Sequence, residues 1–284
     1  MNAAFIHRIQ ATVAPALRVL ALCVAIVASG ADASRAALLF SETFQYPISS
    51  NLAGQNGGTG FSVAWSGGNS TIVAGLSSGS GSAVQIGSSA SSRQMTSTAS
   101  TSGTSTYITY LMNASNFSGG NYTGLSLYNG GTEEMFMGIP WQTQTFGFDA
   151  RSTTGTAGIK TIDFTPLTST AYLVALGLVP SATSGKVDVK MWATSNLAID
   201  PNALVAGTPN SSLIGLRDNF IFSSIRVAGD YAGALKVAGI ASSPNVSEAA
   251  SVTVNAVPEP STYAMALAGL ACGGYSVFRR RKRA

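Results

Sequence analysis

The sequence predicts an all-β protein, an antiparallel β-sandwich that is flanked by a hydrophobic segment at each end of the chain. Short runs of high β-propensity, bounded by Gly, Ser, Asn or Pro, recur along the middle of the chain. No run between residues 37 and 257 keeps a helical period of apolar residues. This middle segment has roughly 220 residues, which is enough for one domain with its own core. Many short strands at this spacing favour two packed sheets.

Eleven runs are expected to form strands. The run at 186–193 is the clearest, because it alternates apolar with polar residues as a half-buried strand does. The stretch from 77 to 106 is rich in Ser and Thr, and we expect a mobile pair of loops there. The expected strands are 37–43, 70–74, 83–86, 105–112, 122–128, 134–139, 145–149, 171–179, 186–193, 220–227 and 234–240.

The first 33 residues have the order of a secretory signal peptide. Cationic residues precede an apolar run at 19–28, and the segment ends with Ala31-Asp32-Ala33. A positive start, a short apolar core and an Ala-x-Ala step are the features of such a peptide. We expect signal peptidase and the export machinery to act on the chain, with cleavage after Ala33 and Ala36 as a second choice. An uncleaved amphipathic helix is the alternative.

The end of the chain combines three features. Pro258-Glu259-Pro260 precedes an apolar run at 261–278, whose 18 uncharged residues are at the short end of what spans a bilayer as a helix. A basic tail follows and would stay cytoplasmic by the positive-inside rule. Its cations are Arg279, Arg280, Arg281, Lys282 and Arg283. The Pro-Glu-Pro tripeptide, a transmembrane helix of marginal length and a basic tail that stops translocation together indicate a sorting signal.

This tail resembles the PEP-CTERM signal of Gram-negative bacteria that make extracellular polysaccharide. In that family the tripeptide that is here Pro258, Glu259 and Pro260 is the recognition mark. The resemblance implies a partner, a membrane protease of exosortase type that removes the helix and the basic tail. It also implies an inner-membrane-anchored precursor and a final place on the cell surface or in the extracellular matrix. In a host without that protease, the tail would be an ordinary anchor.

The formal net charge of +4 belongs to the two terminal segments. Residues 37–257 contain eight cations and ten acids, a net charge near −2, so a nucleic-acid partner is excluded. The only histidine, His7, and both cysteines, Cys23 and Cys272, lie in the terminal segments. The middle segment can therefore build no Ser-His-Asp or Cys-His site, no disulfide and no zinc site with nitrogen or sulfur ligands.

Four parts of the middle segment resemble the concanavalin A-like or laminin-G-like jelly roll. They are an opening strand at 38–44, a Gly-aromatic-Trp step at 60–65, a long hairpin at 172–176 and 187–192, and a closing strand at 220–229. The resemblance implies a jelly-roll β-sandwich at 37–243. A linker at 244–257 would then join the sandwich to the sorting signal at 258–284.

The acids of the middle segment argue against an enzyme. Glycoside hydrolases, which are frequent in this fold class, need two carboxyl groups roughly 5–10 Å apart. On one strand such a pair occupies positions i and i+2 or i and i+4. Glu133 and Glu134 are neighbours, expected on opposite faces, and the other acids stand alone in the sequence. We expect no catalytic residues, although two strands can still bring acids together in space.

Calcium is the one metal that the composition allows, because carboxylate and carbonyl oxygens bind it without His or Cys. Laminin-G-like domains often hold calcium, and Asp218 and Asn219 are the best candidate ligands here. No acids have the spacing of an EF-hand, and Asp and Asn commonly cap turns by bonding to their own backbone. We therefore expect neither a metal site nor a cofactor.

The three tryptophans are candidate sugar platforms, because an aromatic ring stacks on the apolar face of a pyranose. Trp192 lies in a strand-like run and is expected in the core, whereas Trp141 follows Pro140 at an expected strand end, where it can be exposed. Trp141 is therefore the candidate glycan-binding residue. A structural role is still favoured over sugar binding for all three.

We expect an exported, non-enzymatic surface or exopolysaccharide-matrix protein with a structural or adhesive sandwich. The alternative is a lectin-like module that binds extracellular polysaccharide with or without calcium.

Overall fold

The structure, a computed structural model, describes residues 38–76, 81–101, 103–114, 122–141, 143–151, 157–162, 170–230 and 233–254. The expected signal peptide, with Ala31 and Ala33, lies outside the described residues. The sorting segment from Pro258 to the basic tail at 279–283, including the apolar run at 261–278, lies outside them as well. In the described part of the chain, none of the helices is long and apolar enough to cross a membrane.

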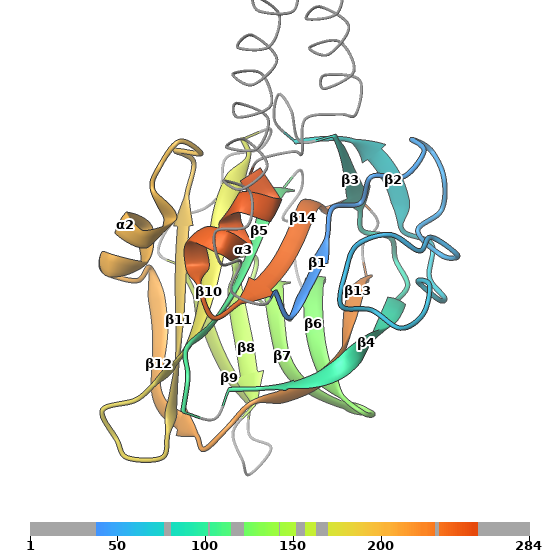
Figure 1. The fold of residues 1–284 in the computed structure, drawn as a ribbon. Helices are drawn as coiled ribbons and strands as arrows, with labels where there is room; N and C mark the ends of the chain where they lie inside the picture. Colours follow the sequence, from blue (N-terminus) through green and yellow to red (C-terminus); the bar gives the residue numbers. More distant parts are fainter. Residues whose placement is uncertain are drawn as a thin grey trace, which may run out of the picture. The chain divides into compact units, whose positions relative to one another are not determined.

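Two antiparallel sheets pack face to face and form a β-sandwich (Figure 1). The strands in the described residues are β1 (Phe40–Glu42), β2 (Thr71–Ala74), β3 (Ser82–Gln85), β4 (Ser91–Ser100), β5 (Thr106–Ala114), β6 (Thr123–Asn129), β7 (Thr132–Ile139), β8 (Gly147–Arg151), β9 (Ala157–Thr161), β10 (Tyr172–Pro180), β11 (Val187–Thr194), β12 (Ser211–Arg217), β13 (Ile221–Gly229) and β14 (Leu235–Ser243). The larger sheet has the order β12-β11-β10-β5-β14-β3-β2, and β1 also pairs with β14. The smaller sheet has the order β4-β13-β6-β7-β8-β9.

The all-β sandwich predicted from the sequence is confirmed, and all eleven expected strands are present with ends shifted by at most three residues. Three strands were missed: β4, β9 and β12. The expectation of mobile loops is wrong for residues 91–100, which form β4. Its buried positions alternate, but they are occupied by Ser91, Arg93, Met95 and Ala99, a mixture that gives no hydrophobic period.

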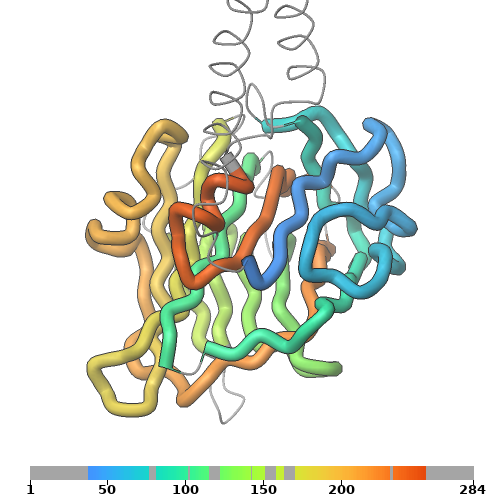
Figure 2. The backbone as a smooth tube through the Cα atoms, in the orientation of Figure 1, coloured from blue at the N-terminus to red at the C-terminus, as the bar shows by residue number. Residues whose placement is uncertain are grey.

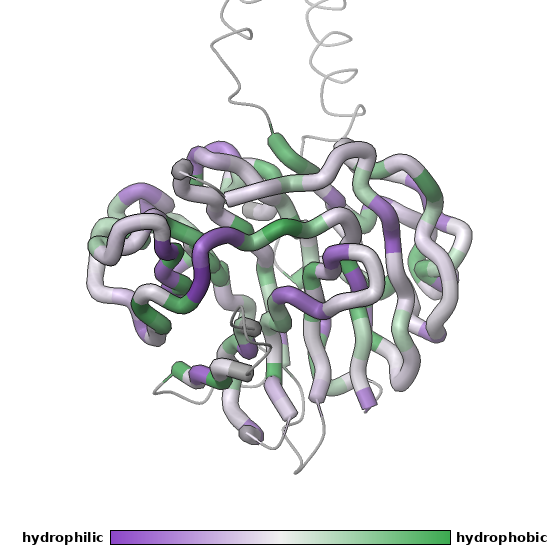
Figure 3. Tube along the Cα trace, turned by 90° about the horizontal axis from the view of Figure 1, so that it is seen from below, coloured by the Kyte–Doolittle hydropathy of each residue, from purple (hydrophilic) through white to green (hydrophobic). Residues whose placement is uncertain are grey.

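The main core lies between the two sheets and is built from alternate residues of most strands. Leu125 and Leu127 of β6 and Met135 and Met137 of β7 point into it, for example, and are fully buried. The residues between them point to the opposite face, because side chains alternate along a strand. Figure 3 shows hydrophobic and polar stretches side by side along the strands.

A buried ion pair joins the two sheets at the N-terminal end of the fold. Arg93 on β4 lies 2.6 Å from the carboxylate of Glu42 on β1, and the two side chains are 2% and 1% exposed. The same carboxylate accepts hydrogen bonds from the Tyr46 hydroxyl, the Trp65 indole and the Phe44 backbone N–H. Burial and the neighbouring Glu42 carboxylate raise the pKa of Tyr46 to about 12. The loop after β1 is therefore fixed by polar contacts as well as by the core.

Two short helices lie beside the outer face of the larger sheet. The first, α2 (Pro201–Ala206), starts after Asp200, whose carboxylate accepts a hydrogen bond from the Asn202 N–H at 2.9 Å. The second, α3 (Val246–Val254), packs on β14, β5 and β10 (Figures 1 and 2). Ala249 and Ala250 of α3 are 0% and 1% exposed. Most of the segment expected to be a linker is thus a helix docked on the sandwich.

Trp192 shows how these helices are held. Its side chain is buried on the outer side of the larger sheet, in a second cluster with Ala175 and Val246, and packs beside Leu204 of α2. Its indole N–H donates a hydrogen bond to the Gly207 carbonyl at 2.9 Å. Trp192 is therefore buried, but under the helices and not between the sheets.

Candidate functional site

The outer face of the smaller sheet carries a row of side chains from four neighbouring strands. Arg226 on β13 lies opposite Ser126 on β6, Ser126 lies opposite Phe136 on β7, and Phe136 lies opposite Asp149 on β8. The residues that flank each of them along its strand belong to the main core or are buried with it, so this row faces away from the core. The register of the sheet therefore brings a cation, a hydroxyl, an aromatic ring and an acid into one line.

A hollow of about 140 Å³ lies on this row. Three aromatic rings shape it: the Tyr122 ring is 5.9 Å from that of Phe136, edge-on, and 6.1 Å from that of Trp141. Trp141 is 52% exposed, whereas Trp65 and Trp192 are 2% and 4% exposed. The hollow is lined by Tyr122, Glu133, Phe136, Pro140, Trp141, Asp149 and Arg226. An exposed tryptophan thus stands at the edge of a small site that also contains charged groups.

The charged groups of the hollow are organised around Arg226. Its guanidinium lies 3.0 Å from the carboxylate of Glu133 and 4.7 Å from the centre of the Tyr128 ring. Burial and the Glu133 carboxylate raise the pKa of Tyr128 to about 12, so its hydroxyl is neutral at ordinary pH. The buried Arg226 Nε and Ser126 Oγ have no hydrogen-bond partner among the described residues. Arg226, which lines the hollow, and Ser126 beside it in the row therefore have hydrogen-bonding capacity left.

A β-bulge places Glu133 on this outer face. The β6–β7 register shifts so that Leu127 lies opposite Met135, whereas Tyr128 lies opposite Glu133. The extra residue, Glu134, is buried and forms an ion pair with Arg217 of β12 in the other sheet. The two glutamates therefore point to different partners, as their adjacency in the sequence suggested.

The structure brings together two acids that stand apart in the sequence. Glu133 on β7 and Asp149 on β8 line the same hollow with Trp141. Sequence reasoning identified Trp141 from the turn after Pro140, but it gave no reason to group it with Tyr122, Asp149 or Arg226. Only the pairing of β13, β6, β7 and β8 shows that they are neighbours.

The candidate calcium ligands have other partners. Asp218 forms a surface ion pair with Lys186 at 2.6 Å, and the Asn219 side chain bonds to Ser100 and Thr101. No three residues among His, Cys, Asp and Glu in the described ranges cluster as a metal site would require. The arrangement offers no support for a calcium site at Asp218 and Asn219.

A family model for the PEP-CTERM protein-sorting motif matches residues 256–282. The chain thus carries this sorting signal, which implies export, a precursor held in the membrane by its C-terminal segment, and processing by an exosortase-type membrane protein. A comparison with curated proteins finds no match.

Solved structures with a similar fold are distant in sequence. The globular domain of T. cruzi calreticulin has a TM-score of 0.49 and 11% identity, covering 75% of this chain and 90% of that chain. Domain 4 of AbnA, a GH43 extracellular arabinanase from Geobacillus stearothermophilus solved with arabinotriose, has a TM-score of 0.48 and 10% identity, covering 78% and 100%. The binding domain of botulinum neurotoxin serotype D has a TM-score of 0.46 and 11% identity; the match covers 74% of this chain but only 48% of that one.

Proposed function

We propose that this chain is a non-enzymatic protein of the cell surface or the exopolysaccharide matrix of a Gram-negative bacterium, with a sandwich that has a structural or adhesive role. The observation that carries the proposal is the sorting motif that begins at residue 256, two residues after α3 ends at Val254. Because α3 is docked on the larger sheet, the motif follows the folded domain almost directly. The part of the chain that the sorting signal would bring to the surface is therefore the folded sandwich itself, with no long linker between the sandwich and the signal.

The shapes and linings of two concave sites support a role without catalysis. The hollow beside Trp141 contains two acids, but its 140 Å³ is below the roughly 300–1,000 Å³ of ligand-enclosing pockets. It can take one sugar ring, and Glu133 in it is already paired with Arg226. A larger cleft between β9 and β12, of about 710 Å³, has no carboxylate among the described residues that line it. Neither site combines room for a glycosidic bond with two acids, as hydrolysis requires.

The sorting step is tested by replacing the two prolines of the recognition tripeptide, since proline disfavours helical backbone at its own position and at the residue before it. We expect the Pro258→Ala, Pro260→Ala double variant to accumulate as an uncleaved, membrane-held precursor. Intact mass and cell fractionation of the protein from its native host measure this. Pro244→Ala, an exposed proline outside the motif, is the control and should be processed normally. Normal processing of the double variant would contradict the proposal.

The hollow favours a second candidate function, a lectin-like contact with extracellular polysaccharide. Trp141 and Tyr122 present ring surface to solvent beside the Arg226–Glu133 pair and Asp149. Rings supply apolar contact for the C–H face of a sugar, and charged groups bond to its hydroxyls. Together they have the chemistry to hold one sugar unit of a longer chain.

We expect Trp141→Ala to weaken binding of the host polysaccharide about tenfold, since an exposed aromatic anchor contributes about 1–2 kcal/mol. Trp141→Phe keeps a ring and should lose less. Binding is measured by pull-down and titration with and without a chelator, which also tests calcium. Unchanged binding by Trp141→Ala would rule out this contact, and new reducing ends in the polysaccharide would show that the protein is an enzyme after all.

A further inference from the structure

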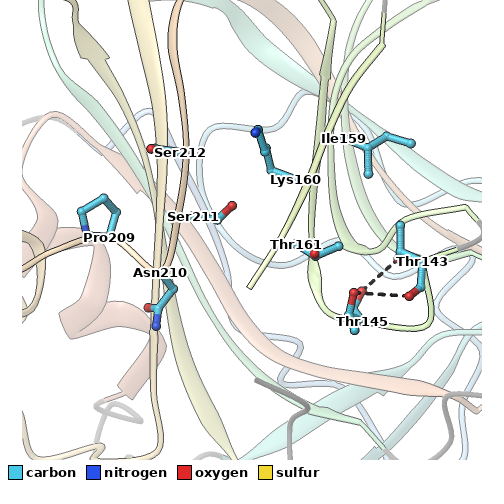
Figure 4. Close-up of a pocket in the computed structure, with 9 residues that line it drawn as sticks. All are labelled: Thr143, Thr145, Ile159, Lys160, Thr161, Pro209, Asn210, Ser211 and Ser212. Carbon is cyan, nitrogen blue, oxygen red and sulfur yellow. Dashed lines mark hydrogen bonds between the residues drawn. The ribbon is translucent and has the colours of Figure 1, made fainter. Parts of the chain in front are cut away.

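The two sheets separate along one side of the sandwich, where β9 and β12 are the edge strands. The edges approach closely at Gly158, where an added Cβ would lie only 2.7 Å from the Leu213 side chain. Beyond this contact the edges open into a cleft of about 710 Å³. Its lining is Thr143, Thr145, Ile159, Lys160, Thr161, Pro209, Asn210, Ser211 and Ser212 (Figure 4). The cleft has the volume of a small-molecule site.

Among the described residues, the lining of the cleft is rich in hydroxyl groups and contains one charge, Lys160. Lys160 projects from β9 into the gap toward β12 (Figure 4), and its amine forms no ion pair with the described residues. The hydroxyls of Thr161, Ser211 and Ser212 make no side-chain hydrogen bond to the described residues either. The Thr143 and Thr145 hydroxyls and the Asn210 side-chain oxygen are bonded already. A single cation beside three hydroxyls that are free of such bonds matches a ligand with one carboxylate and several hydroxyls.

Lys160 reaches the cleft because of its position in the strand. It lies opposite Phe148, which points into the main core, so Lys160 is on the inner side of β9. An inward-pointing charge on an edge strand can also serve only to prevent pairing with another chain. That simpler role requires no hydroxyl on the facing strand, whereas here Ser211, which pairs with the core residue Met191, points toward Lys160 across the gap.

We propose that this cleft binds an acidic sugar unit, a hexuronate in a polysaccharide chain, with Lys160 pairing to the carboxylate and the Thr, Ser and Asn side chains bonding to the ring hydroxyls. The loop between β7 and β8 carries Trp141 toward the hollow and Thr143 and Thr145 toward the cleft. One glycan can therefore contact both sites. The cleft does not depend on the sorting motif, so its failure would leave the sorting proposal intact.

The test compares hexagalacturonic acid with its methyl ester, which has the same backbone without the charges. We expect the processed protein, or the full chain in detergent, to bind the acid at least about tenfold more tightly than the ester in calorimetric titration. Lys160→Gln should bring affinity for the acid down about tenfold, toward that of the ester, and Lys160→Arg should retain it. Raised salt should weaken binding of the acid but not of the ester.

Lys236→Gln, on β14 away from the cleft, is the matched control and should bind as the unaltered protein does. Three results would each overturn the proposal. These results are that the ester binds as tightly as the acid, that Lys236→Gln loses as much affinity as Lys160→Gln, or that inorganic sulfate displaces the acid at equal concentration. If the Lys160→Gln variant forms oligomers but binds hexagalacturonic acid as tightly as before, Lys160 serves only to prevent the edge strand β9 from pairing with another chain.

Discussion

Replacing Arg93 by Met is expected to destabilise the protein by about 3–5 kcal/mol, because the substitution leaves the Glu42 carboxylate buried without its cation. The Arg93 guanidinium also bonds to the Val63 carbonyl at 2.8 Å and the Asn56 side chain at 2.7 Å. The substitution therefore releases the loop before β2 as well as the carboxylate. Urea unfolding followed by tryptophan fluorescence measures the loss, and Trp65, which bonds to Glu42, reports it locally.

Lys186→Met is the matched control. Lys186 and Asp218 are also 2.6 Å apart, but their side chains are 35% and 69% exposed, so breaking this pair should cost no more than about 1 kcal/mol. The double variant Glu42→Gln, Arg93→Met should lose less than the sum of the single losses, because neither buried charge is left alone. Equal losses for Arg93→Met and Lys186→Met would show that burial of the pair is unimportant.

The fold was predictable where burial follows the strand period. The run at 186–193 alternates because one face of β11 packs in the core, and that signal is local. Residues of β12 are mostly half-buried on both faces, so this edge strand has no period to detect. The helix α3 has a recognisable start, since Asn245 caps the Ser247 N–H at 2.9 Å and Glu248 follows three residues later. Its nine residues are too few to show an apolar period clearly.

The candidate sites were less predictable than the fold, because they depend on register. Exposure of Trp141 could be expected from the preceding proline, but its neighbours come from other strands whose pairing no local pattern gives. The cleft has the same origin, since Lys160 and Ser212 belong to different sheets and are more than fifty residues apart. Arg93 and Glu42 are 51 residues apart, and a charged residue in a Ser-rich stretch is ordinarily expected at the surface.

Gly138→Ala is expected to destabilise the protein by roughly 3 kcal/mol or more, through both backbone strain and close contact. Gly138 has φ of +148°, which side chains rarely tolerate, and an added Cβ would lie 2.3 Å from the Thr123 carbonyl oxygen. It would also lie 2.6 Å from the Cα of Gly124, which faces Gly138 across the β6–β7 pair. Neither neighbour is a flexible side chain, so the strands themselves must separate.

The matched control, Gly131→Ala, lies in the turn of the same strand pair. Its added Cβ would meet nothing within 4 Å, so its stability should stay within about 0.5 kcal/mol of the unaltered protein. Gly138 is also two residues before Pro140, so separation of β6 from β7 should move Trp141 and weaken any contact made by the hollow. Thermal unfolding and polysaccharide binding of both variants measure the two effects together. Equal melting temperatures would show that the backbone at Gly138 yields easily, and the hollow would then not depend on this close pairing of strands.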